Sequence, residues 1–404
     1  MAFKRTNNYN DFIQNEIATL EKDNLYRRLK IVSVEKKRGT TRVDGTEQII
    51  NLCSNDYLGL SQNKEILTKT ILSLKQISQC SSRLIAGNDP NIIALEEKLA
   101  EHREVECSLV YPTGYMANLG VITTLADKFT TVLSDELNHA SIIDGCRLSG
   151  ANIKVFRHND MEHLLKLIKM ISSERKKIIV TEGVFSMDGD ISNLRQICNI
   201  AKEYNAITLV DDAHGDFIFG DSSPLSSRFS GVPSYLRVND EVDVQTSSLS
   251  KGLGCFGGYV ASTSQIRELL INKSRQFIYT SALPEHLCVS ALTAYPIAKA
   301  GNRQEKLFEN LNYMFKNLLQ LGFKLESKSS RSQIIPVVIG DEKIAIEFSK
   351  QLLDKGIFVQ AIRYPTVKKG SARLRISVTA LHNNSQLAYA IDSLESIGKK
   401  LVII

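Results

Sequence analysis

The sequence predicts an α/β fold with a large, mostly parallel, doubly wound sheet and a smaller α+β domain at its C-terminal end. From about residue 89, short apolar runs alternate with helical patterns, which is typical of a parallel sheet with helices on both faces. Past about residue 290 this alternation stops, and a helical stretch is followed by isolated strand-like runs. The 404 residues exceed one typical core. We therefore predict an N-terminal helix and connector, a large domain and a small domain, at residues 1–50, 51–290 and 291–404.

Residues 1 to about 45 are expected to form a polar amphipathic helix and a basic connector. Leu20, Leu25 and Leu29 have roughly helical spacing in this part of the chain. Residues 48–52 then predict a short strand that leads into the turn-rich residues 53–60.

The large domain should begin its helix–strand alternation at Asp89 and Pro90, which are typical of a helix cap and a first helical residue. This helix is predicted to continue through Leu99. The strand-like runs that follow are at residues 108–111, 131–133, 153–156, 178–180, 207–210 and 259–261. In the C-terminal part, strands are predicted at residues 333–338, 358–363 and 372–378.

Composition excludes several classes of protein. The net charge of +6 arises from 50 basic and 44 acidic side chains without a basic block, so we expect no nucleic-acid partner. The seven cysteines are scattered without a CxxC pair, which indicates neither a zinc site nor a disulfide framework. No metal is expected. The N-terminus lacks an apolar leader and no apolar run is long enough to span a bilayer. We therefore expect a cytoplasmic protein without a membrane partner.

One short segment, residues 247–258, places Lys251 among hydroxyls and glycines directly after an extended run. Hydroxyls suit a phosphate, and glycines let the backbone approach a ligand closely. A lysine in such a pocket can form a Schiff base if burial or a neighbouring cation lowers its pKa. A surface lysine in a glycine-rich loop would show the same residues, so the interpretation depends on the upstream segments.

Three upstream segments follow predicted strands, where an α/β sheet places its functional groups. Asp211 and His214 end the run at residues 209–215, and Asp211 could keep a pyridine nitrogen protonated. Ser186 lies in a glycine- and carboxylate-rich loop, and His139 could stack on a flat ring. Each of these segments is also compatible with an ordinary turn or a capped helix.

Gly114 and Tyr115 open a predicted helix whose free backbone N–H groups suit a phosphate. The segment is neither a Walker A loop nor a GxGxxG fingerprint. An ordinary capped helix start would have the same composition. The order of the segments is more specific than any one of them: phosphate loop, histidine, serine loop, Asp-x-x-His and hydroxyl-flanked lysine.

In this order the chain resembles the α-oxoamine synthases, fold-type I enzymes that use pyridoxal 5′-phosphate (PLP). The resemblance runs from about Asn51 to the C-terminus. The stretches that carry it are residues 54–60, 82–88, 181–190, 210–215, 373–375 and 380–382. Residues 216–220 depart from the small Thr-Gly-hydrophobic run that is usual in the family, which leaves the acyl chain length open.

The resemblance implies roles for individual residues. Lys251 would form the Schiff base with PLP and later transfer protons, Asp211 would pair with the pyridinium nitrogen, and His139 would stack over the ring. His214 and Ser186 would bond the ring-oxygen side. The residues implied at the phosphate are Gly114, Tyr115 and Ser248, with Thr280 or Ser281 from a second subunit. Those implied near substrate carboxylates are Arg27, Asn55, Arg363, Thr366 and Arg375.

The implied reaction joins an amino acid to an acyl thioester with loss of carbon dioxide and coenzyme A. Residues 82–88 and 361–366 favour the branch that condenses L-alanine with a pimeloyl thioester in biotin biosynthesis. The branch that condenses glycine with acetyl-CoA is the alternative, and the thioester carrier, coenzyme A or an acyl carrier protein, stays open. An aminotransferase on the same fold is a further alternative. A catalytically silent binding protein is disfavoured, because Lys251, Asp211, His139 and His214 are all present. A homodimer is expected, because active sites of this fold usually lie between two subunits.

Overall fold

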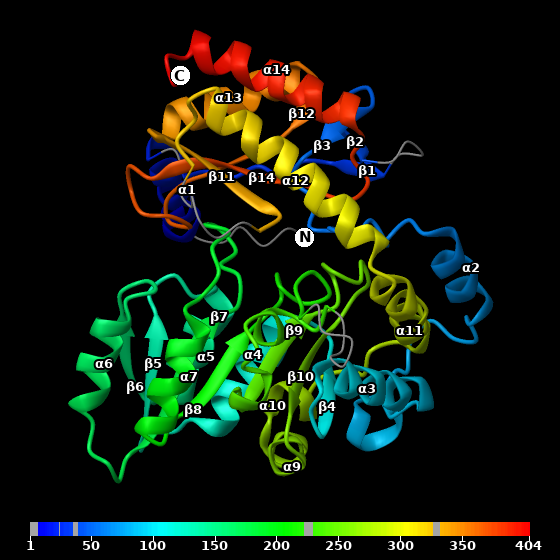
Figure 1. Ribbon diagram of the computed structural model, residues 1–404, viewed down its shortest axis with the longest axis vertical. Helices are drawn as coiled ribbons and strands as arrows, with labels where there is room; N and C mark the ends of the chain where they lie inside the picture. Colours follow the sequence, from blue (N-terminus) through cyan, green and yellow to red (C-terminus); the bar gives the residue numbers. More distant parts are fainter. Residues whose placement is uncertain (1–6, 24, 35–38, 222–228, 326–331) are drawn as a thin grey trace.

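The computed structural model describes residues 7–23, 25–34, 39–221, 229–325 and 332–404. It has two lobes, with the seven-stranded sheet in one and the helices α12, α13 and α14 in the other (Figure 1). The N-terminal helix α1 (Asn7–Lys22) lies with the C-terminal lobe, so α1 and the C-terminal helix α14 belong to the same half of the molecule.

The large lobe is organised around a sheet of strand order β4-β10-β9-β8-β7-β5-β6. Strands β5 to β9 pair only in parallel with one another, whereas β10 runs antiparallel to both β9 and β4. This confirms the predicted mostly parallel sheet. The strands are β4 (Cys107–Tyr111), β5 (Thr130–Asp135), β6 (Asn152–Phe156), β7 (Lys176–Glu182), β8 (Ile207–Asp211), β9 (Val244–Ser248) and β10 (Gly258–Ser262).

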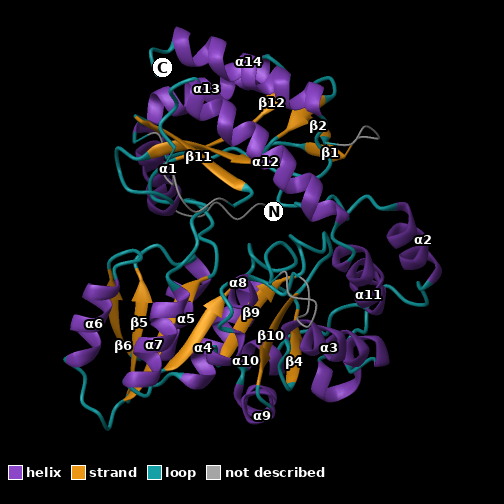
Figure 2. Ribbon diagram, in the orientation of Figure 1, coloured by secondary structure: helices purple, strands orange, loops and turns teal. Residues whose placement is uncertain are grey.

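Helices cover both faces of this sheet (Figure 2). Alternate residues of each strand enter two separate cores: Ile179 and Val210 pack in one, Val180 and Leu209 in the other. This is the doubly wound arrangement that the alternation predicted. The helices of the lobe are α2 (Lys64–Leu72), α3 (Pro90–Arg103), α4 (Gly114–Leu125), α5 (Ala140–Ser149), α6 (Met161–Lys169), α7 (Leu194–Glu203), α8 (Val232–Tyr235), α9 (Ser264–Lys273), α10 (Arg275–Ile278) and α11 (Glu285–Lys299).

The C-terminal lobe packs helices on two small sheets around a third core. Its sheets have the strand orders β1-β2-β3-β12 and β11-β14-β13. The elements are β1 (Val32–Val34), β2 (Thr40–Val43), β3 (Ile49–Asn51), α12 (Asn302–Gln320), β11 (Ile334–Gly340), α13 (Glu342–Asp354), β12 (Ile357–Phe358), β13 (Gln360–Ile362), β14 (Ala372–Ser377) and α14 (Asn384–Lys400).

Three local expectations differ from the structure. Helix α1 ends at Lys22, so Leu25 and Leu29 lie outside it, and part of the expected connector forms the strands β1 and β2. The run at residues 358–363 is divided between two sheets, because β12 pairs with β3 and β13 pairs with β14. Alternation along a strand shows which side chains share a face, but it does not show which partner the strand will have.

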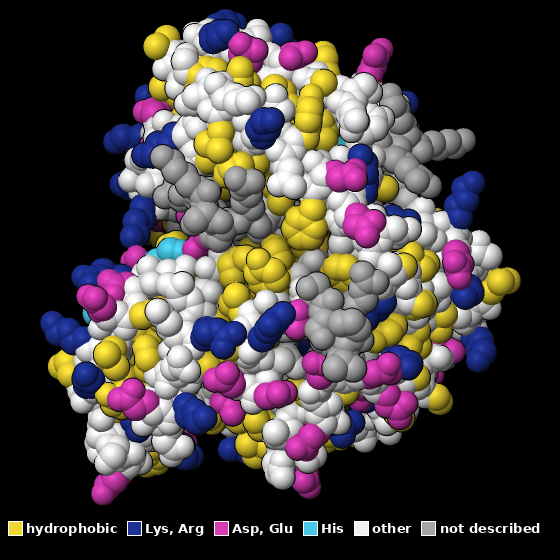
Figure 3. Space-filling view, viewed as in Figure 1, with side chains coloured by type: hydrophobic (Ala, Val, Ile, Leu, Met, Phe, Trp, Pro, Cys, Tyr) yellow, Lys and Arg dark blue, Asp and Glu magenta, His cyan; other side chains and the backbone are white. Residues whose placement is uncertain are grey.

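Charged side chains of both signs are interspersed over the visible face of the molecule (Figure 3). In the part of the chain that the structure describes, no helix is long and apolar enough to cross a membrane. The same residues contain no group of three or more His, Cys, Asp or Glu side chains that could hold a metal ion.

We expect the core of the C-terminal lobe to be sensitive to loss of volume at Leu374, a fully buried residue of β14. Replacing Leu374 with alanine should lower the free energy of unfolding by about 2–5 kcal/mol, since it removes apolar burial and leaves a cavity. Urea unfolding followed by circular dichroism measures this. Leu148→Ala, at an exposed leucine of α5, is the control and should change the value by less than about 0.5 kcal/mol. Equal effects of the two substitutions would contradict the packing of this lobe.

Candidate active site

Loops that follow four neighbouring strands bring the predicted residues to one edge of the large sheet. Asp211 is the last residue of β8 and His214 lies in the turn after it. Ser186 follows β7, Lys251 follows β9, and His139 follows β5 as the N-cap of α5. Because the strands β5, β7, β8 and β9 are parallel, their carboxyl ends meet at the same edge.

A chain of polar contacts runs from Lys251 into the interior. The Lys251 Nζ lies 3.0 Å from His214 Nε2, and His214 Nδ1 lies 2.7 Å from the hydroxyl of Tyr57. Burial lowers the pKa of Lys251; nearby Asp211 and Glu182 oppose this shift, whereas Arg375 adds to it. Burial also lowers the pKa of His214, and the charges of Lys251 and Arg375 lower it further. Within the folded protein His214 is therefore neutral at ordinary pH, and Lys251 loses its proton more readily than a surface lysine.

Asp211, the last residue of β8, is buried next to this cluster. Its carboxylate accepts hydrogen bonds from Asn118 Nδ2 at 2.6 Å and from the backbone N–H of Ala213 at 3.0 Å. His139 has an exposed ring, and its Nδ1 accepts a hydrogen bond from the backbone N–H of Ser141 at 3.2 Å. In the single chain His139 is thus exposed, whereas the carboxylate of Asp211 is buried.

The start of α4 is the segment that the sequence predicts to bind a phosphate. Thr113 caps this twelve-residue helix, and Gly114 is its first residue. A Cβ atom at Gly114 would lie 3.1 Å from the Cβ of Ser248, so glycine lets the helix start approach the end of β9. The Ser248 hydroxyl lies 2.7 Å from that of Ser250. Tyr115 is exposed and donates a hydrogen bond to Asp144.

Two arginines of β14 reach the Ser186 loop from the C-terminal lobe. Arg375 donates from Nε to the carbonyl of Ser186 at 2.7 Å and from Nη1 to Asn55 Oδ1 at 3.2 Å. Arg373 forms an ion pair with Asp188 at 2.6 Å. The C-terminal lobe thereby holds the loop that carries one of the predicted cofactor residues.

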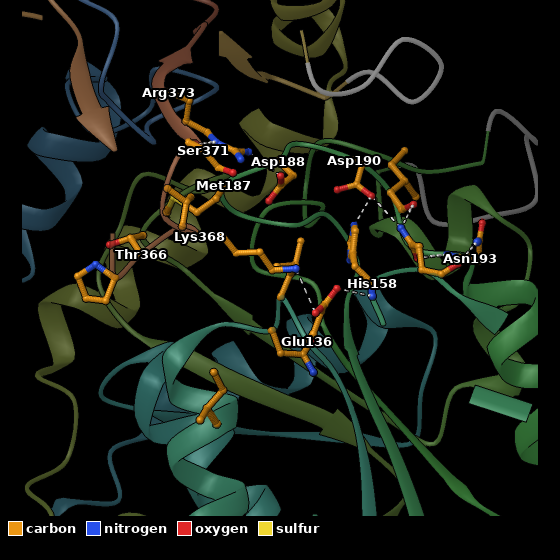
Figure 4. Close-up of a pocket in the computed structure, with 17 residues that line it drawn as sticks. Glu136, His158, Met187, Asp188, Asp190, Asn193, Thr366, Lys368, Ser371 and Arg373 are labelled. Atoms are coloured by element: carbon orange, nitrogen blue, oxygen red, sulfur yellow. Dashed lines mark hydrogen bonds and ion pairs between the residues drawn. The ribbon is translucent and has the colours of Figure 1, made fainter. Parts of the chain in front are cut away.

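A cavity of about 730 Å³ lies beside this cluster, between the two lobes (Figure 4). Asn138 and Met187, the chain neighbours of His139 and Ser186, contribute to its wall, as does Thr366. Across it, Lys368 reaches from the C-terminal lobe to Glu136 at 3.3 Å. A substrate group that extends from the Lys251 cluster would find both charged side chains, such as Lys368, and apolar ones, such as Met187, on these walls.

Arg27 and Arg363 lie at the junction of the N-terminal segment with the loop before β14. Arg27 donates to the Thr366 hydroxyl at 3.3 Å, and Arg363 donates to the carbonyl of Tyr26 at 2.9 Å. Thr280 and Ser281 are elsewhere, in a small cavity lined by Arg83 and other residues near β4. Among the hydrogen bonds of the described residues, none connects Thr280 or Ser281 with Lys251.

Tyr57 and Asn118 belong to the cluster although no sequence motif assigns them a role. Each directly contacts a predicted site residue that is far away in the chain, His214 and Asp211 respectively. Residues 216–220, which depart from the usual family pattern, also have a structural role. Asp216 does not line the 730 Å³ cavity. It is buried and contacts Arg103 at 3.0 Å and His102 at 2.9 Å.

This buried ionic cluster continues behind the site. Arg103 also pairs with Asp212 at 2.7 Å, and Tyr259 donates its hydroxyl proton to Asp216 at 2.6 Å. Burial raises the pKa of Asp212 to about 7, although Arg103 opposes the shift. Burial raises the pKa of Asp216, but Arg103, His102 and the Tyr259 hydroxyl together outweigh this effect and lower the pKa. The turn at residues 211–216 is therefore anchored by charges on its buried side.

Comparison with known proteins decides the family. A family model described as aminotransferase class I and II matches residues 47–394. The chain is 39% identical to the 8-amino-7-oxononanoate synthase of Thermoanaerobacter pseudethanolicus, over 98% of both chains. The chain therefore belongs to the aminotransferase class I and II family.

Solved structures agree with the assignment. A variant of serine palmitoyltransferase from S. paucimobilis, solved with bound PLP, is 28% identical and matches with a TM-score of 0.91, covering 99% of this chain and 100% of that one. An 8-amino-7-oxononanoate synthase from Francisella tularensis is 26% identical with a TM-score of 0.73, covering 87% and 98%. The comparisons confirm the resemblance to the α-oxoamine synthases, the PLP fold-type I class, the expectation of an enzyme and its dependence on PLP.

The described donor set fits PLP. A ring nitrogen would find the buried carboxylate of Asp211, a phosphate would find the helix start at Gly114, and Lys251 carries the amine that a Schiff base needs.

The cavity wall holds an imidazole between two carboxylates. His158 Nδ1 lies 3.0 Å from Asp135, and its Nε2 lies 2.9 Å from Asp190, which belongs to the loop after β7 (Figure 4). Partial burial would lower the pKa of His158, but the hydrogen bonds and charges of the two aspartates outweigh it and raise the pKa to about 10. A charged His158 therefore ties this loop to the end of β5.

His158→Gln should destabilise the protein in a pH-dependent way. The folded-state pKa lies above the ordinary value of 6.5, so the stabilisation is complete below about pH 6.5 and is lost as the pH rises through about 10. The melting temperature of the variant should therefore lie below that of the wild type at pH 6, and the gap should narrow as the pH approaches about 10. Paired thermal melts across this range test it, and a gap that is constant with pH would show that the imidazolium is not involved.

Proposed function

We propose that this chain is an 8-amino-7-oxononanoate synthase of biotin biosynthesis. It would condense L-alanine with pimeloyl-CoA and release 8-amino-7-oxononanoate, coenzyme A and carbon dioxide. The observation that carries the proposal is the partly buried Lys251 amine, 3.0 Å from His214 and beside Asp211 at the sheet edge. The 39% identity to a relative of that name over 98% of both chains supports the choice of substrates.

Roles are proposed for the residues that would hold PLP. Asp211 would pair with the pyridine nitrogen, His139 would stack over the ring, and His214 and Ser186 would bind on the ring-oxygen side. Gly114, Tyr115 and Ser248 would hold the phosphate, joined by Thr280 or Ser281 of a second copy. When bound, PLP supplies an electron sink for a carbanion at the α-carbon of the amino acid.

Lys251 is the proposed proton carrier. Its lowered pKa leaves more of the amine unprotonated, as a general base near neutral pH requires. His214 stays neutral, so each of its ring nitrogens takes part in one hydrogen bond, toward Tyr57 on one side and Lys251 on the other. The imidazole thus orients the amine without competing for its proton.

Arginines from both ends of the chain are proposed to bind carboxylates. Arg375, buried beside Asn55 and the Ser186 loop, suits the carboxylate of the amino acid. Arg27 and Thr366 lie 3.3 Å apart, and Thr366 lines the 730 Å³ cavity, so this pair suits the far carboxylate of the acyl group. Arg363 completes the same junction.

We propose a cytoplasmic homodimer that uses coenzyme A or an acyl carrier protein as the thioester carrier. Several large apolar side chains of α1 are exposed in the single chain, among them Tyr9, Phe12 and Leu20. A second copy would cover such a surface. Ser281 is exposed as well, which would allow it to contribute to the site of a partner.

Thiol release from the PLP-loaded enzyme tests the proposed reaction. L-Alanine with pimeloyl-CoA should release free coenzyme A faster than glycine with acetyl-CoA or serine with palmitoyl-CoA. Lys251→Ala should slow this release by about 10²–10⁴-fold, because it removes the proton carrier. Lys69→Ala, at a surface lysine of α2, is the matched control and should leave the rate unchanged.

Other outcomes are equally informative. Preference for glycine with acetyl-CoA would keep the fold and the lysine chemistry but move the chain to the other branch. No thiol release with any pair, from a protein that binds PLP, would contradict the acyltransferase proposal.

A further inference from the structure

Three polar side chains stand in a row across the carboxyl end of the sheet. In the parallel register, Glu182 of β7 is the neighbour of Asp211 of β8, and Asp211 is the neighbour of Thr246 of β9. Residues paired in register on parallel strands project to the same face of a sheet. Glu182 and Asp211 are therefore two adjacent buried carboxyl groups, 2% and 7% exposed.

The hydrogen bonds around Asp211 suit an ionised carboxylate. Thr246 donates its hydroxyl proton to Asn118 Oδ1 at 2.6 Å, which turns the amide NH₂ of Asn118 toward Asp211. With the N–H of Ala213, Asp211 thus receives two donors. An ionised carboxylate is an acceptor only, so both donors match it.

The carboxyl group of Glu182 has fewer hydrogen bonds than that of Asp211. Its Oε2 accepts a hydrogen bond from the backbone N–H of Ser186 at 3.2 Å. Its Oε1 is buried and has no hydrogen-bond partner among the described residues. An ionised oxygen left buried in this way is costly, whereas a protonated carboxyl carries no net charge.

The surroundings of Glu182, taken together, also favour its protonated form. Burial raises its pKa well above the ordinary value, and Asp211 of β8 raises it further. Lys251, from the loop after β9, and the backbone N–H groups of Ser186 and His139 oppose the shift without cancelling it. Two neighbouring carboxyls in one dry site do not both ionise easily, and the less solvated one keeps the proton.

We propose that Glu182 is a positioning residue that stays protonated, holds the Ser186 loop, and leaves Asp211 as the single carboxylate that faces PLP. This inference rests on the proposed PLP site and adds a division of roles within it. The neutral Glu182 prevents a second negative charge beneath the ring. It also explains how two neighbouring strand ends, each with an acidic side chain, present only one carboxylate to the cofactor.

Glu182→Gln tests the protonation state in the cofactor-free protein. A raised folded-state pKa means that stability falls as the pH rises above about 4.5, since the unfolded chain ionises while the folded chain does not. Glutamine removes this dependence. The melting temperature of the variant should therefore exceed that of the wild type by roughly a few °C at neutral pH, and the gap should grow as the pH rises.

Glu96→Gln is the matched control. Glu96 is also buried, but it pairs with Arg83 and with Arg267, the latter at 3.2 Å. The same substitution there should lower the melting temperature at neutral pH, because it removes the charge that two arginines need. If Glu182→Gln behaved like this control, Glu182 would be ionised and paired with Lys251, and the proposal would be overturned.

Infrared spectroscopy gives a second readout that does not depend on a variant folding. The wild-type protein should show the carbonyl band of a protonated carboxylic acid at about pH 8, a pH well above the range in which glutamate ordinarily titrates. In Glu182→Gln this band should be lost. A wild-type spectrum without such a band would contradict the proposal.

PLP binding separates this inference from the proposed function. Glu182→Gln should bind PLP about as tightly as the wild type, whereas Glu182→Ala, which leaves the Ser186 N–H unpartnered, should bind roughly 5- to 100-fold more weakly. A wild-type protein that fails to bind PLP would defeat the proposed function but leave the melting and infrared results valid. Equal PLP affinity in Glu182→Ala would remove the positioning role.

Discussion

The in-register parallel pairing of β7, β8 and β9 is the constraint on which the candidate site depends. It sets the spacing of Glu182, Asp211 and Thr246, and the loops that leave these strand ends carry Ser186, His214 and Lys251. A shift of one residue in any of these pairings would turn the corresponding side chain to the opposite core. The two apolar cores on the faces of the sheet therefore maintain the register and, with it, the chemistry at the edge.

The smaller lobe takes part in the site directly. Arg375 and Arg373 reach the Ser186 loop from β14, and Gln333 donates to the carbonyl of His214 at 2.7 Å. Tyr57, which contacts His214, lies in the segment that leads from β3 into the large lobe. The position of the turn at residues 211–216 thus depends on contacts between the lobes as well as on the sheet beneath it.

Much of the fold could be predicted from the sequence, because local patterns report local structure. Asp211 and His214 were found as polar residues at the end of an apolar run, and Pro90 after Asp89 marked a helix start that the structure has. The division of residues 358–363 between two sheets could not be found in this way, since it depends on distant strands. The same holds for Asp216: the sequence shows that its segment is unusual, but its partner Arg103 is more than a hundred residues away. Asn118 reaches Asp211 over a similar separation.

The buried pair of Arg103 and Asp212 has a consequence for how the sequence can diverge. A Cβ atom at Gly231 would lie 1.8 Å from Asp212 Oδ2 and 2.3 Å from Arg103 Nη1, and the backbone there has a φ of 94°. A Cβ atom at Gly215 would lie 2.1 Å from Asp212 Oδ1. Neither glycine can acquire a side chain while Arg103 and Asp212 keep these positions, and loss of Arg103 would leave the buried Asp212 without its ion-pair partner. Substitutions at these four positions, Arg103, Asp212, Gly215 and Gly231, should therefore occur together rather than singly as the sequence diverges.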